Sequence, residues 1–169
     1  KIYFCFTYPY TYSRVQEDLD AMNGYQNQLN DPKSLYWHRE LLTGTRDGNR
    51  VDLVTISSCN GIDMDEKEPL FDSIFPEAKS DGSSRPHAFP EKQILWISGR
   101  VHPGEVPAQH TIKGIFKLLL DEGNVISQEL RRRYVFKIVP MINPDGVIRG
   151  HFRMDQFGQN LNRYYGTPD

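Results

Sequence analysis

The sequence predicts an α/β fold in which helices lie on the faces of a β-sheet, and three observations lead to this prediction. Two nearly continuous apolar runs, QILWISG at 93–99 and YVFKIVPMIN at 134–143, have the composition of strands that are covered on both faces. Between them, residues 106–120 repeat apolar side chains at helical spacing, with a proline in the first turn. A strand, a helix and a strand in this order are typical of two parallel strands with the helix packed on the sheet.

The N-terminal third adds a strand, a helix and a hairpin. Residues 1–12 are dense in aromatic and β-forming side chains and read as a strand that leads into a turn. A Ser-x-x-Gln capping box predicts a helix from Ser13 to about Leu29. The strand-like runs 36–42 and 50–57 flank an Asp-Gly pair, which is typical of a hairpin turn.

The remaining segments are expected to be connections, apart from one short helix. Residues 59–92 are rich in Asp, Glu, Ser, Gly and Pro, which predicts a long surface loop and not a domain boundary. Gly123 is the expected C-cap of the central helix, and 127–133 has the composition of a short second helix. The NPDG sequence at 143–146 predicts a β-turn, and an extended loop is expected from Val147 onward.

Composition narrows the class of protein. The 169 residues are 38% hydrophobic and 25% charged, which suits one globular unit with a core of its own. A formal net charge of −2 gives no indication of nucleic acid or an anionic membrane as partner. Cys5 and Cys59 form no C-x-x-C pair and no disulfide framework, so a reducing cytosol is the simplest compartment.

The stretch RVHPGE at 100–105 carries the first candidate site. His102 and Glu105 flank a Pro-Gly kink just after a predicted strand, where ligand sites of α/β sheets form. Such a pair can reach one metal ion, and zinc accepts both imidazole nitrogen and carboxylate oxygen. Taken alone, the pair fits equally well a polar loop in which His102 bonds to the backbone.

Two further stretches carry polar groups. Asn162 and Arg163, in GQNLNR, are adjacent and could grip a carboxylate, because a guanidinium offers a two-pronged fork. A solvated loop explains them as well. Arg153 stands apart from other charges except Asp155, and by itself it is compatible with a surface position.

In combination these motifs resemble a known family. YPYTYSR, HRELL, RVDLVTISSCNG, RVHPGE, VFKIVPMINPDGVIRGHFR and GQNLNR resemble the cytosolic carboxypeptidases, zinc metallocarboxypeptidases that remove glutamate from tubulin tails. The acidic loop most resembles the type-5 branch. The resemblance covers nearly the whole chain. It implies a mixed sheet with helices on both faces, truncated before the second half of the domain. Residues 13–169 would be the N-terminal half of the catalytic domain, with a long polar loop at 59–92, and residues 1–12 the end of a preceding β-rich domain and its linker.

The resemblance also implies roles for individual residues. His102 and Glu105 would be the first two ligands of Zn²⁺, and Arg153 would polarise the scissile carbonyl and stabilise the oxyanion. Asn162 and Arg163 would hold the C-terminal carboxylate of the substrate. The family's third ligand, a His, and its general-base Glu are expected well downstream of Arg163 and are absent from these 169 residues. We therefore expect the chain to be inactive alone.

The implied activity is deglutamylation of tubulin or another polyglutamylated protein, in the cytosol and in association with microtubules. Two alternatives stay open: an N-acyl amino acid hydrolase of the aspartoacylase kind, and a non-catalytic pseudoenzyme or splice fragment that binds carboxylates. The NPDG and NLNR stretches favour the peptidase over the first, and a downstream His followed by a Glu would favour the enzymes over the second. The other candidates are expected to be structural or surface groups: His38, His87, His110, His151 and the run Arg131–Arg133.

Overall fold

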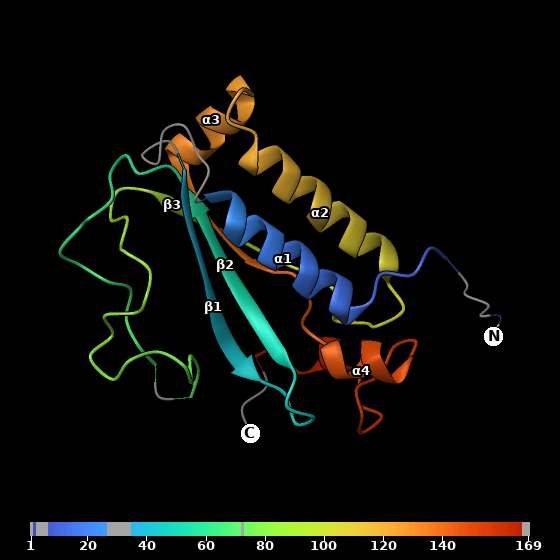
Figure 1. The fold of residues 1–169 in the computed structure, drawn as a ribbon. Helices are drawn as coiled ribbons and strands as arrows, with labels where there is room; N and C mark the ends of the chain where they lie inside the picture. Colours follow the sequence, from blue (N-terminus) through green and yellow to red (C-terminus); the bar gives the residue numbers. More distant parts are fainter. Residues whose placement is uncertain (1, 3–6, 27–34, 72, 167–169) are drawn as a thin grey trace.

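The computed structural model describes residues 2, 7–26, 35–71 and 73–166, which contain both helices and strands (Figure 1). In chain order they are α1 (Tyr12–Gln26), β1 (Tyr36–Gly44), β2 (Arg50–Ser57), β3 (Gln93–Ser98), α2 (Val106–Leu120), α3 (Val125–Arg133), β4 (Tyr134–Val139), α4 (Pro144–Arg149) and the 3₁₀ helix η1 (Leu161–Arg163).

The four strands form one mixed sheet in the order β1-β2-β4-β3. The β1–β2 hairpin is antiparallel, β2 and β4 are antiparallel, and β3 and β4 are parallel. The hairpin turns at Gly48, whose φ of 80° favours glycine. The predicted α/β class, the hairpin and the strand–helix–strand unit are confirmed.

Helices α1 and α2 lie side by side over one face of the sheet (Figure 1). Their apolar faces meet the side chains of β1, β2 and β4 that point to this face, including Trp37, Val54 and Ile138. These inward positions alternate along β2 and β4, as the pleat requires. This packing fixes the position of the N-terminal end of α2, where the RVHPGE stretch enters the helix.

The start of α1 differs from the prediction. The helix begins at Tyr12, and Thr11 Oγ1 accepts from the backbone N–H of Arg14 at 3.2 Å. The Gln16 side chain does not close a capping box, because its amide reaches across to Asp52 on β2, at 2.9 Å. The expected end of the helix at Leu29 lies outside the described residues.

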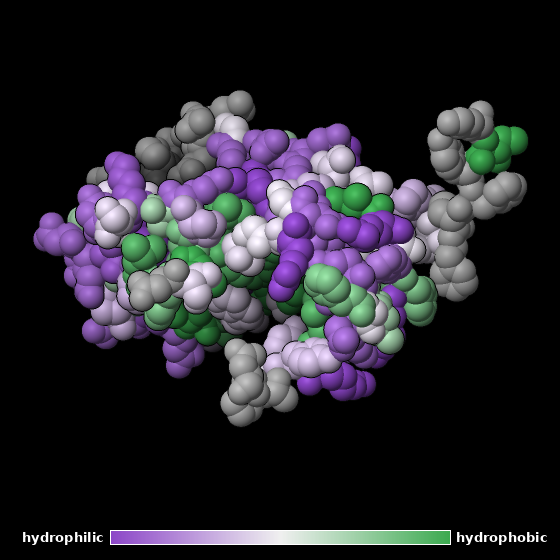
Figure 2. All heavy atoms as spheres, turned by 90° about the horizontal axis from the view of Figure 1, so that it is seen from below, coloured by the Kyte–Doolittle hydropathy of each residue, from purple (hydrophilic) through white to green (hydrophobic). Residues whose placement is uncertain are grey.

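The 59–92 loop is more than a surface loop, because part of it covers the other face of the sheet. Phe75, Arg85 and Phe89 are buried there. Arg85 pairs with Glu40 on β1, and Lys137 on β4 pairs with Glu68 of the loop at 2.5 Å. Seen from below, green apolar side chains gather between the loop and the sheet (Figure 2). They surround a hollow of about 640 Å³ whose lining includes Leu53, Phe71, Phe75, Ile94 and Trp96.

The expectation that the first apolar run is covered on both faces is wrong for this chain. β3 is the edge strand, and Ile94 and Trp96 are 61% and 58% exposed. The hollow beneath the 59–92 loop leaves their face open. An apolar run therefore identified the strand but not its place in the sheet.

Helix ends also depart from the prediction. The C-cap of α2 is Asp121 and not Gly123. Helix α3 begins at Val125, two residues before the predicted start, because the Asn124 side chain accepts from the backbone N–H groups of Ile126 and Ser127. No helix in the described part of the chain is long and apolar enough to cross a bilayer.

Candidate metal centre

The RVHPGE stretch forms the connection from β3 to α2 and brings His102 and Glu105 together. Glu105 is the N-cap of α2, and its backbone N–H donates to His102 O at 3.1 Å, which closes a turn over Pro103 and Gly104. His102 Nδ1 lies 2.6 Å from Glu105 Oε1. The imidazole is buried, whereas half of the Glu105 side chain is exposed. The pair therefore stands at the carboxyl end of β3 with its carboxylate open to solvent.

The other imidazole nitrogen is held by Asn160. His102 Nε2 lies 3.0 Å from Asn160 Oδ1, and the same oxygen accepts from the backbone N–H of Asn162 at 3.1 Å. Because Oδ1 only accepts, Nε2 must carry the hydrogen. A hydrogen bond of this kind fixes the ring orientation and the tautomer of metal-binding histidines.

The remaining contacts of Nδ1 fit a cation. With the hydrogen on Nε2, neutral His102 presents a lone pair at Nδ1, and Arg153 Nη1 lies 3.5 Å from this atom. The ionised Glu105 carboxylate also offers only lone pairs, so its 2.6 Å approach to Nδ1 needs either a proton between the two atoms or a cation beside them that binds both. The donor set, imidazole nitrogen and carboxylate oxygen, is one that zinc accepts. The described residues contain no group of three or more His, Cys, Asp or Glu side chains that could hold a metal.

The NPDG stretch is not an isolated β-turn, as was predicted, but the start of α4. Asn143 caps this helix by accepting from Gly146 N–H at 2.9 Å, and Pro144 occupies its first turn, where a missing N–H is tolerated. Asn143 also donates to Val101 O at 3.3 Å. A Cβ on Gly146 would lie 2.4 Å from Pro103 Cγ. Helix α4 thus packs against the turn over Pro103 and Gly104.

Asp145 connects this region to the β1–β2 hairpin. Its buried carboxylate accepts from Thr45 Oγ1 at 2.6 Å, from Asn49 Nδ2 at 2.8 Å and from the backbone N–H of Asp47 at 3.3 Å. Three donors around one carboxylate make a strong anchor. The hairpin turn therefore supports α4, and α4 supports the turn over Pro103 and Gly104.

The segment after α4 brings Arg153 to the site. Phe152 O accepts from Gly104 N–H at 2.7 Å, which docks this segment on the Pro-Gly turn. Arg153 follows directly and reaches Nδ1 of His102. His151 points elsewhere, since its Nδ1 lies 3.2 Å from Met154 O. The structure therefore places Arg153, and not His151, beside His102 and Glu105.

Asn162 and Arg163 lie on η1, and both side chains are exposed. Asn160 is the N-cap of η1 and also the partner of His102, so this short helix is joined to the site. Arg163 Nη1 donates to Asn162 O at 3.0 Å. The exposed guanidinium is available to a carboxylate that enters from solvent.

Two residues at this site were not singled out from the sequence. Asn160 lies 58 positions after His102, and nothing local marks it, although an Asn two residues before the Asn-Arg pair suits a helix N-cap. Arg100 is buried at the start of the turn and has a φ of 56°. A signal for Arg100 was present in its position two residues before His102 of the His-x-x-Glu motif.

Comparison with known proteins identifies the family of this chain. The profile of the zinc carboxypeptidases, peptidase family M14, matches residues 22–167. The chain belongs to the zinc carboxypeptidase family. Among solved zinc carboxypeptidase-like structures, a putative carboxypeptidase A from Shewanella denitrificans superposes with a TM-score of 0.65 at 31% identity. One from Burkholderia mallei gives 0.66 at 28%. Each covers 95% of this chain, and the chain covers 33% of each.

Within the zinc carboxypeptidase family, the chain is similar to the cytosolic carboxypeptidases. It is 43% identical to cytosolic carboxypeptidase-like protein 5 of Danio rerio over 98% of its length, and 44% identical to that of Mus musculus over 99%. Identity to human cytosolic carboxypeptidase 1 is 37% over 98%. The chain spans 19% of the type-5 relatives and 12% of the type-1 relative.

Proposed function

We infer that the protein to which this chain belongs is a zinc metallocarboxypeptidase that removes C-terminal or branch-linked glutamate from proteins such as tubulin. The observation that supports it most is the contact of His102 Nδ1 with Glu105 Oε1 at 2.6 Å, with Nε2 held by Asn160 and Arg153 beside the pair. The family match and the cytosolic carboxypeptidase relatives support the same reaction class and a cytosolic location.

Different side chains would bind the metal, polarise the substrate carbonyl and orient the metal ligand. His102 and Glu105 would hold zinc, which supplies Lewis-acid activation of a water molecule and of the scissile carbonyl. Arg153, next to the pair, would donate to the carbonyl oxygen as negative charge develops on it. Asn160 keeps the Nδ1 lone pair of His102 directed at the site.

Recognition of a chain end needs a fixed positive group at some distance from the metal. Asn162 and Arg163 offer an amide and a guanidinium fork on η1, and both are exposed. Asn160 connects η1 to His102, so carboxylate binding and metal binding share one framework. We propose that this pair holds the α-carboxylate of the terminal or branch-point glutamate.

The test measures free glutamate released from a polyglutamylated tubulin-tail peptide by the full-length parent protein with zinc. His102→Ala should abolish release. The matched control is His87→Ala, which removes an imidazole from the 59–92 loop and should retain activity. Release that depends on zinc and on His102 supports the deglutamylase. Zinc binding without release from any acyl-glutamate substrate would instead favour a non-catalytic carboxylate-binding protein.

A further inference from the structure

Arg100 lies two residues after the end of β3, just before the turn that joins His102 to Glu105, and its side chain is buried. Its Nε and Nη2 donate to Pro103 O at 3.0 and 2.7 Å. Its Nη1 donates to Tyr10 O at 3.1 Å. The guanidinium thus spans two backbone carbonyls that lie 93 positions apart, and one of them is inside the turn between His102 and Glu105.

The backbone conformation of Arg100 is costly, which indicates that its side chain is required there. A φ of 56° lies in the left-handed region, which non-glycine residues rarely occupy. Residues hold such conformations where the surrounding structure compensates for them, often at functional sites. Here three hydrogen bonds from one buried guanidinium compensate.

The carbonyl that Arg100 holds decides the shape of the turn. Pro103 and Gly104 are its central residues, and Pro followed by Gly ordinarily favours a type II turn with glycine at positive φ. Gly104 is not among the glycines at positive φ. Turn types I and II differ in the orientation of the peptide between the two central residues. Pro103 O belongs to that peptide. A flip of this peptide would turn Pro103 O away from Arg100 and change the φ of Gly104, directly before Glu105.

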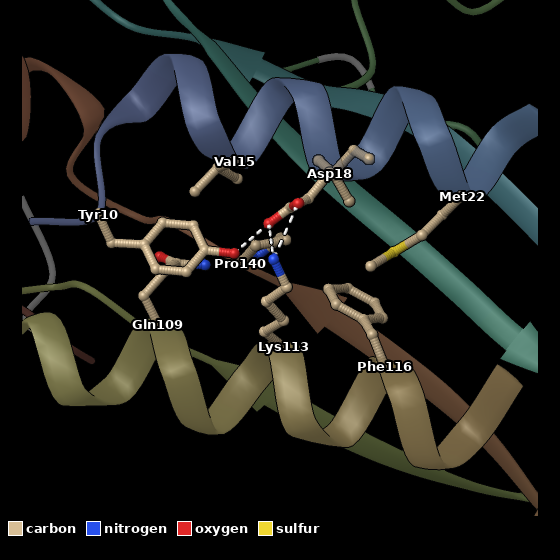
Figure 3. A pocket seen from close by; sticks show the side chains of 9 residues that line it. Tyr10, Val15, Asp18, Met22, Gln109, Lys113, Phe116 and Pro140 are labelled. Atoms are coloured by element: carbon tan, nitrogen blue, oxygen red, sulfur yellow. Dashed lines mark hydrogen bonds and ion pairs between the residues drawn. The ribbon is translucent and has the colours of Figure 1, made fainter. Parts of the chain in front are cut away.

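Tyr10, the second anchor, is itself fixed. Its hydroxyl donates to Asp18 on α1, and Asp18 pairs with Lys113 on α2 at 3.0 Å (Figure 3). The ring packs edge-on against His110, with centroids 5.1 Å apart. The Arg100 fork therefore joins the turn to a segment that both helices hold in place.

We propose that Arg100 is a positioning residue for the metal pair: its fork holds the Pro103–Gly104 peptide in the orientation that directs His102 and Glu105 at one ion. This role rests on the proposed zinc site. Lysine cannot replace it, because one ammonium group lacks the planar fork that reaches Pro103 O twice and Tyr10 O once.

The test compares variants of the full-length parent protein by Zn²⁺ affinity, measured by competition with a chelator, and by the visible spectrum of the Co²⁺-substituted protein. Arg100→Lys keeps the charge but loses the fork. Arg100→Gly loses the fork and relieves the strained φ, so its backbone should fold readily. Partners that orient metal ligands typically contribute 10- to 100-fold in affinity, and we expect a loss of about this size in both variants, with an altered Co²⁺ spectrum.

Arg39→Lys is the matched control. Arg39 is also largely buried and donates to Asp52, Asp20 and Gln16, but it lies on β1 away from the turn. It should lower the unfolding temperature and leave Zn²⁺ affinity unchanged. Affinity within threefold of wild type in both Arg100 variants would overturn the proposal, and so would an equal loss in Arg39→Lys. If the wild type binds no zinc, or His102→Ala binds it equally well, the proposed zinc site fails together with this role.

Discussion

Two glycine-to-alanine substitutions should have opposite effects, because the two sites differ in the space around the missing Cβ. At Gly104, a Cβ would lie 2.6 Å from Phe152 Cδ2 and 2.7 Å from Phe152 O. The Phe152 ring is 75% exposed and can rotate away. The carbonyl cannot, because it accepts the hydrogen bond from Gly104 N–H at 2.7 Å.

The expected cost follows from that carbonyl contact. At 2.7 Å, the Cβ would be 0.7 Å inside the 3.4 Å limit of ordinary van der Waals contact, so the segment with Phe152 and Arg153 must move. Overpacking of this kind costs about 1–3 kcal/mol, and loss of the hydrogen bond adds roughly 1 kcal/mol. We expect Gly104→Ala to destabilise the protein by about 2–4 kcal/mol. Displacement of Arg153 should also reduce kcat.

Gly114 is the matched control, in the middle of α2. Nothing lies within 4 Å of its Cβ position, and alanine has the higher helix propensity. Gly114→Ala should stabilise by about 0.5–1 kcal/mol and leave activity unchanged. Denaturant unfolding of the parent protein and its variants measures both effects. The reasoning is refuted if Gly104→Ala is as stable and as active as Gly114→Ala.

Three further predictions concern other parts of the framework. Asp145→Asn places an amide N–H₂ group among the three donors that now bond to the carboxylate. We expect the free energy of unfolding in urea to fall by about 1–3 kcal/mol. An unchanged urea midpoint would contradict the role of Asp145 as an anchor. Burial, with the positive charges of Lys137 and Arg85, lowers the pKa of His38 from 6.5 to about 4. Between about pH 6.5 and about pH 4, the unfolded chain binds a proton at His38 that the folded chain does not. The free energy of unfolding should therefore fall as the pH drops through this range. His38→Gln should flatten that slope, and an equal slope in the variant would exclude His38 as its source. Removal of zinc by a chelator should lower the unfolding temperature of the wild type but not that of His102→Ala. A metal whose free concentration is about 1,000 times its Kd stabilises the folded state by about 4 kcal/mol.

Local sequence was sufficient to predict the elements in which all residues favour the same secondary structure. The hairpin followed from two β-rich runs around an Asp-Gly pair, and α2 from apolar side chains at helical spacing. The order of strand, helix and strand gave the parallel pairing of β3 with β4. The His102–Glu105 pair was recognisable because three residues around a kink decide that contact.

Local sequence was insufficient where two conformations suit the same residues. Asn-Pro-Asp-Gly is typical of a β-turn, yet Asn is also a good N-cap and Pro a good first helical residue. Contacts of Asp145 with the hairpin, and of Gly146 with Pro103, select the helix. Likewise, an apolar run identifies a strand, but its exposure depends on whether other segments cover it, as β3 shows.

The sequence by itself determined the mixed α/β character of this protein, most of its elements and the residue types of the candidate site. Tertiary structure alone decided which side chains surround that site. Asn160 and Arg153 reach His102 from 58 and 51 positions away, and Tyr10 O meets Arg100 from 90 positions away. The physical reason is that propensity and periodicity act over a few residues, whereas these contacts form only after the sheet and its helices have packed and brought distant segments together.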